Sequence, residues 1–162
     1  MPPSGYRWSL WKPSGISIAP RGFPLFPFAI WSAFHYLHVF FNRDYQLLLI
    51  HHGAQLVHRS VITPGYFRFP FMHRDDLQVG DTWTDDGHRG KGLATFALKQ
   101  IASLDVCVGR SLWYLVEEAN TSSMRVAEKA GFSCVARGTR GSRFGLRLFG
   151  AFHIDERFQP RC

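Results

Sequence analysis

The fold of this chain is decided by residues 81–101, DTWTDDGHRGKGLATFALKQI. The stretch starts as a strand, breaks at residues 85–87, and continues after Gly92 with apolar residues at the spacing of a helix that buries one face. The turn before the helix, residues 89–92, contains two glycines and two cations. Such a turn leaves backbone N–H groups free for an anion, and the helix dipole adds about 0.3–1 kcal/mol to its binding. The pattern therefore predicts a phosphate-binding turn.

This turn belongs to neither of two familiar classes of nucleotide-binding loop. It lacks the Gly-Lys-Ser/Thr sequence of a Walker loop. It also lacks the third glycine and the βαβ surroundings of a dinucleotide fingerprint. On its own, the turn is equally compatible with a basic helix start that binds nothing.

A second stretch repeats the order of strand, turn and helix. Residues 112–116 are apolar and predict a buried strand, and residues 120–132 read NTSSMRVAEKAGF. We expect a helix from about Thr121 to Ala130, with Asn120 able to cap its start and Gly131 suited to end it.

Together the two stretches resemble the GNAT acyltransferases. Arg89-x-x-Gly92-x-Ala94 is similar to the Arg/Gln-x-x-Gly-x-Gly/Ala pattern with which that family holds the pyrophosphate of acyl-coenzyme A. The strand, asparagine, helix and Lys-Ala-Gly-Phe of residues 112–132 are similar to its second signature, and the order and gap of the two motifs also fit. The resemblance covers residues 45–151 approximately.

The resemblance implies a layered α/β (α+β) fold. Its mixed, mostly antiparallel central sheet would have about six to seven strands, flanked by helices, with central strands that splay apart around the pantetheine arm. It implies direct transfer of an acetyl group from acetyl-CoA, as cosubstrate, to an amine. The cofactor-binding groups would be the backbone of Trp83 and Thr84 for the pantetheine and thioester, residues Arg89, Gly90, Lys91, Gly92, Leu93, Ala94 and Thr95 for the pyrophosphate, and Asn120 for the pantetheine region.

The chain departs from the family at the catalytic acid. A tyrosine often stands four residues before the glycine of the Gly-Phe pair, and this chain has Ala127 there. Ser123, one turn earlier on the same helix face, or a bound water could protonate the leaving thiolate instead. For the base, Glu117 is our first candidate, with Glu118 and Asp81 also near the strand ends. The plain alternative for each is a solvated surface carboxylate.

Length and composition suit one cytoplasmic domain with a real core. The chain has 162 residues, 46% of them hydrophobic, and a net charge of +7, which indicates either a solvated basic surface or attraction for an anionic ligand. The sequence has no basic stripe with interleaved aromatics, the pattern that would indicate a nucleic-acid binder. The three cysteines are far apart and imply no disulfide framework, which fits a reducing compartment. The eight histidines do not cluster, so we expect no metal.

Along the chain, we expect an irregular N-terminal arm over residues 1–22 and one GNAT acyltransferase domain over residues 23–162. Residues 23–41 carry no charge and support two interpretations. We favour a helix from about Pro27 that packs on the sheet over membrane contact, because a span needs about 20 apolar residues and this stretch is interrupted.

Residues 45–62 predict a hairpin around Gly53, and Gly80 predicts a bulge. Strands over residues 132–136 and 144–149 would form a terminal hairpin. Residues 66–74 form either a loop pinned by its aromatics or a wall of the acceptor pocket.

The motifs do not identify the amine that accepts the acetyl group. The aromatic N-terminal region and residues 66–74 loosely resemble GNAT members of bacterial surface-polysaccharide synthesis, which suggests an amino sugar, free or nucleotide-linked. Two other classes of function are a non-catalytic acyl-CoA-binding or membrane-peripheral interaction module, and a basic nucleic-acid binder. No pattern predicts the oligomeric state.

Overall fold

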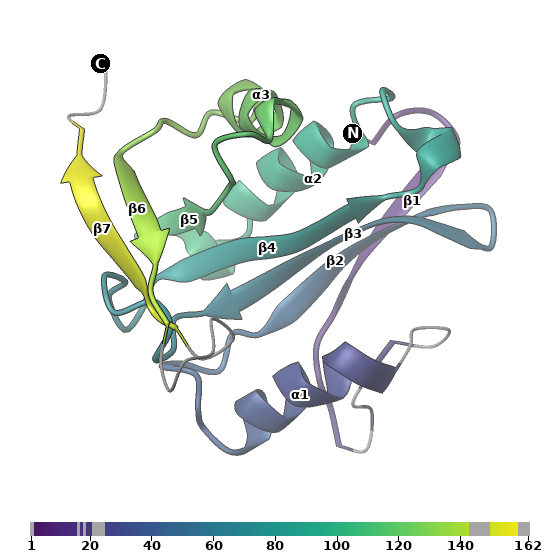
Figure 1. The fold of residues 1–162 in the computed structure, drawn as a ribbon. Helices are drawn as coiled ribbons and strands as arrows, with labels where there is room; N and C mark the ends of the chain where they lie inside the picture. Colours follow the sequence, from purple (N-terminus) through teal and green to yellow (C-terminus); the bar gives the residue numbers. More distant parts are fainter. Residues whose placement is uncertain (1, 16, 18, 21–24, 143–149, 159–162) are drawn as a thin grey trace.

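A five-stranded sheet forms the centre of the computed structural model, which describes residues 2–15, 17, 19–20, 25–142 and 150–158 (Figure 1). Its strands lie in the order β1 (Tyr6–Trp11), β2 (Gln46–His52), β3 (Gln55–Pro64), β4 (Leu77–Thr84) and β5 (Leu112–Tyr114). Neighbours from β1 to β4 are antiparallel, and β4 and β5 are parallel. The predicted mixed, mostly antiparallel sheet and the β2–β3 hairpin are confirmed.

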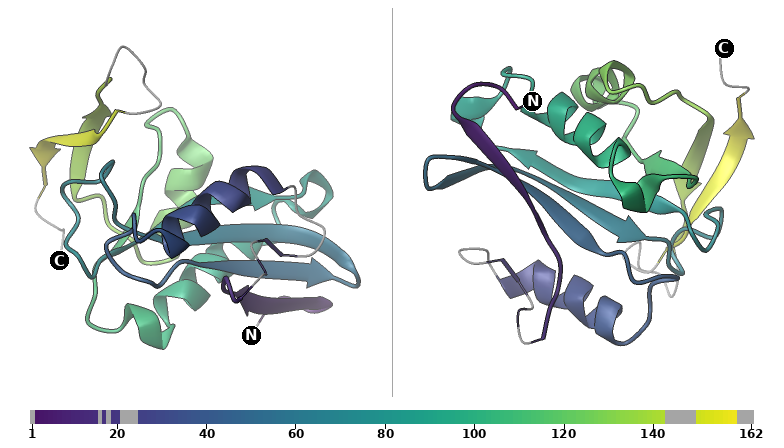
Figure 2. Two further views of the ribbon diagram at one scale, coloured as in Figure 1. Left: turned by 90° about the horizontal axis from the view of Figure 1, so that it is seen from below. Right: turned by 180° about the vertical axis from the view of Figure 1, so that it is seen from behind.

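Helices cover both faces of this sheet (Figures 1 and 2). α2 (Leu93–Ala102) and α3 (Thr121–Lys129) lie over one face, called here the α2 face, and α1 (Leu25–Tyr36) lies over the other, the α1 face. Short 3₁₀ turns at Asp86–His88 and Asp105–Cys107 flank α2. The helices expected after Gly92 and Asn120 are confirmed. The helix expected near residue 27 begins at Leu25.

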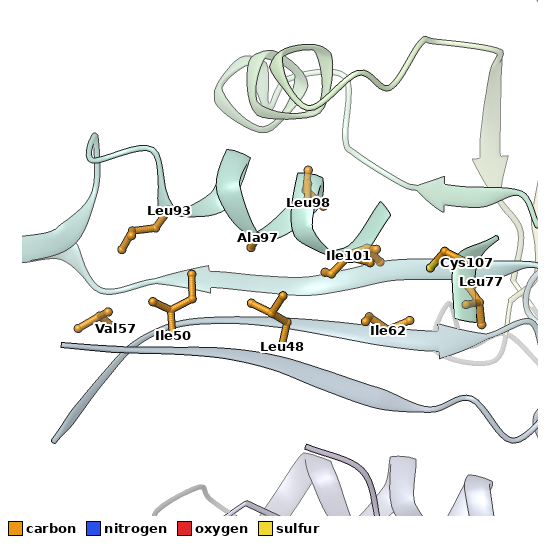
Figure 3. Close-up of a cluster of buried hydrophobic side chains, with 11 residues drawn as sticks. Leu48, Ile50, Val57, Ile62, Leu77, Leu93, Ala97, Leu98, Ile101 and Cys107 are labelled. Atoms are coloured by element: carbon orange, nitrogen blue, oxygen red, sulfur yellow. The ribbon is translucent and has the colours of Figure 1, made fainter. Parts of the chain in front are cut away.

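The core on the α2 face anchors α2 to the sheet (Figure 3). In α2 the buried positions are Leu93, Ala97, Leu98 and Ile101, at the spacing of one helix face. They pack on buried side chains of the sheet and of the following turn, namely Leu48, Ile50, Val57, Ile62, Leu77, Val79 and Cys107. Full burial of one Leu or Ile contributes about 1.5–3 kcal/mol. The cluster thereby holds the turn before α2 in a fixed position against β4.

An aromatic cluster fills the α1 face. The ring of Tyr66 contacts those of Trp31, Phe34 and Phe40, with centroids 5.7–5.9 Å apart. Phe69 and Met72 of the same loop are also buried. Residues 66–74 are therefore a loop pinned over the core by its aromatics, the first of the two interpretations. A contribution of this loop to an acceptor pocket stays a prediction.

The prediction of an irregular arm over residues 1–22 is wrong for Tyr6–Trp11, which form the edge strand β1 along β2. Tyr6 and Trp8 alternate with exposed neighbours and pack against the α2-face core, whereas Trp11 packs on the α1-face cluster. The flanking proline, glycine and serine residues masked this alternation of large aromatics. Pairing with β2, a contact distant in sequence, makes the segment a strand.

The predicted six to seven strands of the central sheet are also wrong: the described residues place five there. β6 (Ala136–Arg140) and β7 (Phe152–Arg157) form a separate two-stranded antiparallel sheet. β6 begins where the predicted strand 132–136 was to end, and the predicted strand 144–149 lies outside the described residues. The pair packs on the aromatic loop instead, because Phe152 stacks on Phe69 at 5.4 Å and its N–H donates to the Arg68 carbonyl at 2.8 Å.

Within the described part of the chain, α1 and the other helices are too short or too polar to cross a membrane.

Candidate active site

The parallel strands β4 and β5 pair over three residues and then separate. Residues 77–79 pair with residues 112–114, and the chain leaves the sheet after Tyr114. β5 is therefore shorter than the predicted strand 112–116. The predicted splaying of the two central strands begins at this point.

A bulge in β4 lies where the two strands part. Val61 pairs with Gly80 and Arg59 with Trp83, so three steps along β4 face two along β3. The extra residue is accommodated by Asp81, which has a φ of +42°. Bulges bend a strand and redirect its side chains. The bulge that Gly80 predicted is thus present, and it lies directly after Val79, the last residue of β4 that pairs with β5.

The gap between the strands is a cleft of about 260 Å³. Its walls come from the bulge, from the segment after β5 and from the start of α3. They comprise Gly80, Asp81, Thr82, Tyr114, Leu115, Val116, Glu117, Asn120 and Ser123. The structure therefore brings together all three predicted catalytic residues and Asn120, which come from positions far apart in the sequence.

The turn before α2 has the geometry of an anion site. Gly90 and Gly92 have φ values of +75° and +77°, which favour glycine. The first helical hydrogen bond runs from Phe96 N–H to the Gly92 carbonyl at 2.9 Å. The N–H groups of residues 93–95 precede that bond, so they have no helical acceptor and point out of the helix start. Lys91 is exposed beside them.

Arg89 plays a different part from the one predicted. Its N–H donates to the Asp86 carbonyl at 3.3 Å, so this group is engaged inside the turn. Its guanidinium pairs with the Asp86 carboxylate at 2.7 Å and donates through Nε to the Thr84 carbonyl at 3.3 Å. Arg89 therefore closes the turn, and the outward-facing donors begin after it.

Asn120 caps α3 from the wall of the cleft. Its Oδ1 accepts from the Ser123 N–H at 3.0 Å and from the Ser122 hydroxyl at 2.9 Å. Its Nδ2 donors have no partner among the described residues. The Oδ1 atom thus caps the helix, and the Nδ2 group of the same side chain stays available to donate to a ligand.

Two carboxylates stand on opposite walls of the cleft. Asp81, on β4, is held by the Arg59 guanidinium through contacts of 3.2 and 3.3 Å. Arg59 in turn lies over the rings of Phe28 and Trp83 at 5.5 and 5.6 Å. Glu117, on the segment after β5, is exposed. Asp81 is therefore fixed in place, whereas the Glu117 side chain has no partner among the described residues.

The side chains of Trp83 and Thr84 do not line the cleft; their neighbour Thr82 does. The bulge shifts the alternation of β4, and the role predicted for the backbone of Trp83 and Thr84 stays a prediction. Trp83 instead covers Arg59, and the Thr84 hydroxyl bonds His58 Nδ1 at 2.7 Å. Ala127 is buried in α3 and supplies no acidic proton.

Sequence reasoning missed His58 and Ser60. Both are fully buried polar residues of β3, and burial lowers the pKa of His58 to about 4, with a smaller contribution from Arg59. Their spacing of two residues was a usable signal, because it places both on one face of a strand.

Within the described ranges, no three His, Cys, Asp or Glu side chains gather closely enough to hold a metal ion.

Comparisons with known proteins identify the family of this chain. The sequence profile of the acetyltransferase (GNAT) family matches residues 32–132, more than half of the 162 residues. A comparison with curated proteins finds no match.

Two solved structures share the fold. One is yncA from Salmonella typhimurium, described as a candidate acetyltransferase with its cofactor acetyl-CoA; its TM-score is 0.55 at 17% identity, over 85% of this chain and 87% of that chain. The other is diaminobutyrate acetyltransferase EctA from Paenibacillus lautus, in complex with its substrate L-2,4-diaminobutyric acid and coenzyme A; its TM-score is 0.50 at 19% identity, over 94% and 93% of the two chains. The profile match over residues 32–132 shows that this chain belongs to the acetyltransferase (GNAT) family.

Proposed function

We propose that this protein is an acetyl-CoA-dependent N-acetyltransferase that transfers the acetyl group directly to an amine. The observation that carries the proposal is the continuity of the site. β4 leads through a short 3₁₀ turn to the turn whose N–H groups suit a pyrophosphate, and the same strand forms one wall of the cleft that holds the candidate catalytic residues. A ligand with a pyrophosphate at one end and a reactive thioester at the other fits such an arrangement.

The residues present fit acetyl-CoA. The N–H groups of Gly90 to Thr95 would bind the pyrophosphate, with Lys91 adding positive charge beside them. The Asn120 Nδ2 group and the backbone of β4 around Thr82 and Trp83 would bind the pantetheine region. When bound, acetyl-CoA supplies an activated acetyl group as a thioester.

The chain itself contributes positioning and proton transfer. Holding an amine against the thioester in a fixed geometry can lower the activation barrier by about 7–11 kcal/mol. Backbone N–H groups of the splayed β4 would polarise the carbonyl. Glu117 is the first candidate to accept a proton from the amine, because it is exposed on the cleft wall and unpaired among the described residues. Asp81 is the second candidate, and Ser123 is the candidate donor to the leaving thiolate.

For the acceptor, the first class to test is an amino sugar, free or nucleotide-linked. The net charge of +7 suits an acceptor with phosphate. Glu117 suits the protonated amine itself, since it lies on the cleft wall without a partner among the described residues, whereas the Asp81 carboxylate is already paired with Arg59. The substrate in the EctA structure is L-2,4-diaminobutyric acid, so this compound belongs in the same comparison.

A thiol-release assay with acetyl-CoA tests the proposal. Glucosamine, a nucleotide-linked amino sugar and L-2,4-diaminobutyrate would serve as acceptors, with product mass as the second readout. We expect turnover with at least one amine, and Glu117→Gln should lower kcat by on the order of 100-fold if this carboxylate is the base. Binding of acetyl-CoA without turnover of any amine would instead support the non-catalytic acyl-CoA-binding module.

A further inference from the structure

Four side chains form an unbroken hydrogen-bonded chain between β3 and β4. His58 Nδ1 lies 2.7 Å from Thr84 Oγ1, and His58 Nε2 lies 3.0 Å from Ser60 Oγ. Ser60 Oγ lies 3.3 Å from Thr82 Oγ1. His58 and Ser60 are fully buried, whereas Thr82 lines the cleft and Thr84 is partly exposed at the end of β4. The chain therefore links the cleft to the outer end of the strand through the interior of the sheet.

The strand register brings these four side chains together. Side chains two residues apart share a face of a strand, so His58 and Ser60 point the same way, and so do Thr82 and Thr84. His58 pairs directly with Thr84 across the two strands. The bulge then turns Asp81 to the Arg59 side and leaves Thr82 beside Ser60.

Acetyl transfer to a protonated amine leaves one proton to remove from the site. An ammonium group has three N–H bonds, and the amide product keeps one. As the N–C bond forms and the C–S bond breaks, one of the two protons goes to sulfur, and the other must reach solvent. The exposed Glu117 offers one route for this proton, and the hydrogen-bonded side chains that begin at Thr82 offer a second.

We propose that Thr82, Ser60 and His58 relay this second proton from the cleft to Thr84, an inference that rests on the proposed function. Thr82 Oγ1 accepts the amine proton that does not go to sulfur, while its own hydroxyl proton passes to Ser60. Ser60 passes its proton to His58 Nε2, and His58 releases the proton on Nδ1 to Thr84. Thr84 releases its own proton to water, so each group gains one proton and loses one.

His58 has the protonation state that a relay requires. Burial, together with the neighbouring Arg59 charge, lowers the pKa of the His58 imidazole to about 4. At neutral pH the ring is therefore uncharged, with one nitrogen that accepts and one that donates. A charged ring would donate from both nitrogens and would interrupt the chain.

The competing explanation is that these groups only satisfy each other inside the sheet. Isosteric variants separate the two. Thr82→Val removes the hydroxyl at the cleft end and keeps the side-chain volume, whereas Thr82→Ser restores the hydroxyl. Thr63→Val is the matched control, because Thr63 is a buried β3 residue whose hydroxyl donates at 3.4 Å to Gln78, outside the chain.

The variants are compared by kcat with the best of glucosamine and L-2,4-diaminobutyrate, by the dissociation constant of acetyl-CoA, and by Tm. We expect kcat of Thr82→Val to fall by on the order of 100-fold, with acetyl-CoA affinity and Tm close to wild type. Thr82→Ser should recover most of the loss, and Thr63→Val should match wild type. Wild-type turnover in Thr82→Val, or a loss of acetyl-CoA affinity that accounts for the whole effect, would overturn the relay.

A second readout needs no turnover. In protein labelled with ¹⁵N-histidine, the His58 ring should stay uncharged from pH 5 to 8, and Thr84→Val should change which ring nitrogen carries the proton. A ring that titrates in this range, or that does not respond to Thr84→Val, overturns the proposal. If wild type acetylates neither amine although the His58 signals behave as expected, the proposed function fails rather than the hydrogen-bonded chain.

Discussion

At the scale of single residues, Arg59 and His58 show how one strand serves two sides of the sheet. Arg59 lies over Phe28 on the α1 face and holds Asp81, while His58 joins Ser60 and Thr84 in the interior. Alternation along β3 could indicate that these neighbours face opposite ways. It could not indicate which residues they meet, because irregularities at Ile50/His51 and Arg59/Val61 shift the register on both sides of β3.

The buried His58 predicts how stability depends on pH. Its pKa is about 4 in the folded protein and about 6.5 when unfolded, so between these values the unfolded chain binds more protons. Folding stability is then highest above pH 6.5 and falls as the pH drops toward 4, by up to about 1.4 kcal/mol per pH unit from this residue.

Urea unfolding of wild type and His58→Gln at pH 7, 6, 5 and 4.5 measures how much His58 contributes to the pH dependence of stability. The variant is expected to be less stable at pH 7, because its polar partners lose the imidazole, but to lose less stability on acidification. Equal slopes for the two proteins would show that His58 is not held uncharged by the fold.

At the scale of elements, the starts of α2 and α3 were predictable and the edges of the fold were not. Gly92 and Asn120 act locally, through a left-handed φ and a side-chain cap, so a short window of sequence reveals them. β1 and the β6–β7 pair depend on partners distant in sequence, such as β2 for Trp8 and Phe69 for Phe152. Local pattern carries little information on such pairings.

Asn120 should prove to have two separable roles. Asn120→Ala removes both the cap and the amide donor, so we expect a loss of about 1 kcal/mol in stability and weaker binding of acetyl-CoA. Asn120→Asp keeps an oxygen that accepts from the Ser123 N–H but removes the donor. It should therefore keep the stability of wild type and still bind acetyl-CoA more weakly.

Tm and calorimetric titration with acetyl-CoA decide between these roles. If Asn120→Asp binds acetyl-CoA as tightly as wild type, the residue is a helix cap alone, and its assignment to the pantetheine region is wrong.

At the scale of the whole molecule, the parallel pair β4 and β5 organises the site. Strands that run in the same direction end at the same edge of the sheet. The glycine-rich turn of residues 89–92 follows β4, and Asn120 with α3 follows β5, so both lie beyond the same edge of the sheet. The two motifs that were recognisable in the sequence are therefore neighbours in space. The exact lining between them, from Gly80 to Thr82, depends on the bulge and on how far the strands separate.

The central claim is that this site binds acetyl-CoA through the turn at the start of α2. Thermal unfolding with and without acetyl-CoA tests it most directly, on wild type, Gly92→Glu and Gly109→Glu. Gly109 is a matched control, because its φ of +73° resembles the +77° of Gly92 and a Cβ at either site meets nothing within 4 Å. It lies beyond the far end of α2, so both variants carry the same backbone strain and charge change, and only Gly92→Glu places the charge in the turn.

At 100 times its dissociation constant, a ligand that binds only the native state stabilises it by about 2.7 kcal/mol. We predict a clear rise in Tm with acetyl-CoA for wild type and Gly109→Glu, and none for Gly92→Glu. No rise in wild type at millimolar acetyl-CoA, or an equal rise in Gly92→Glu, would contradict the account.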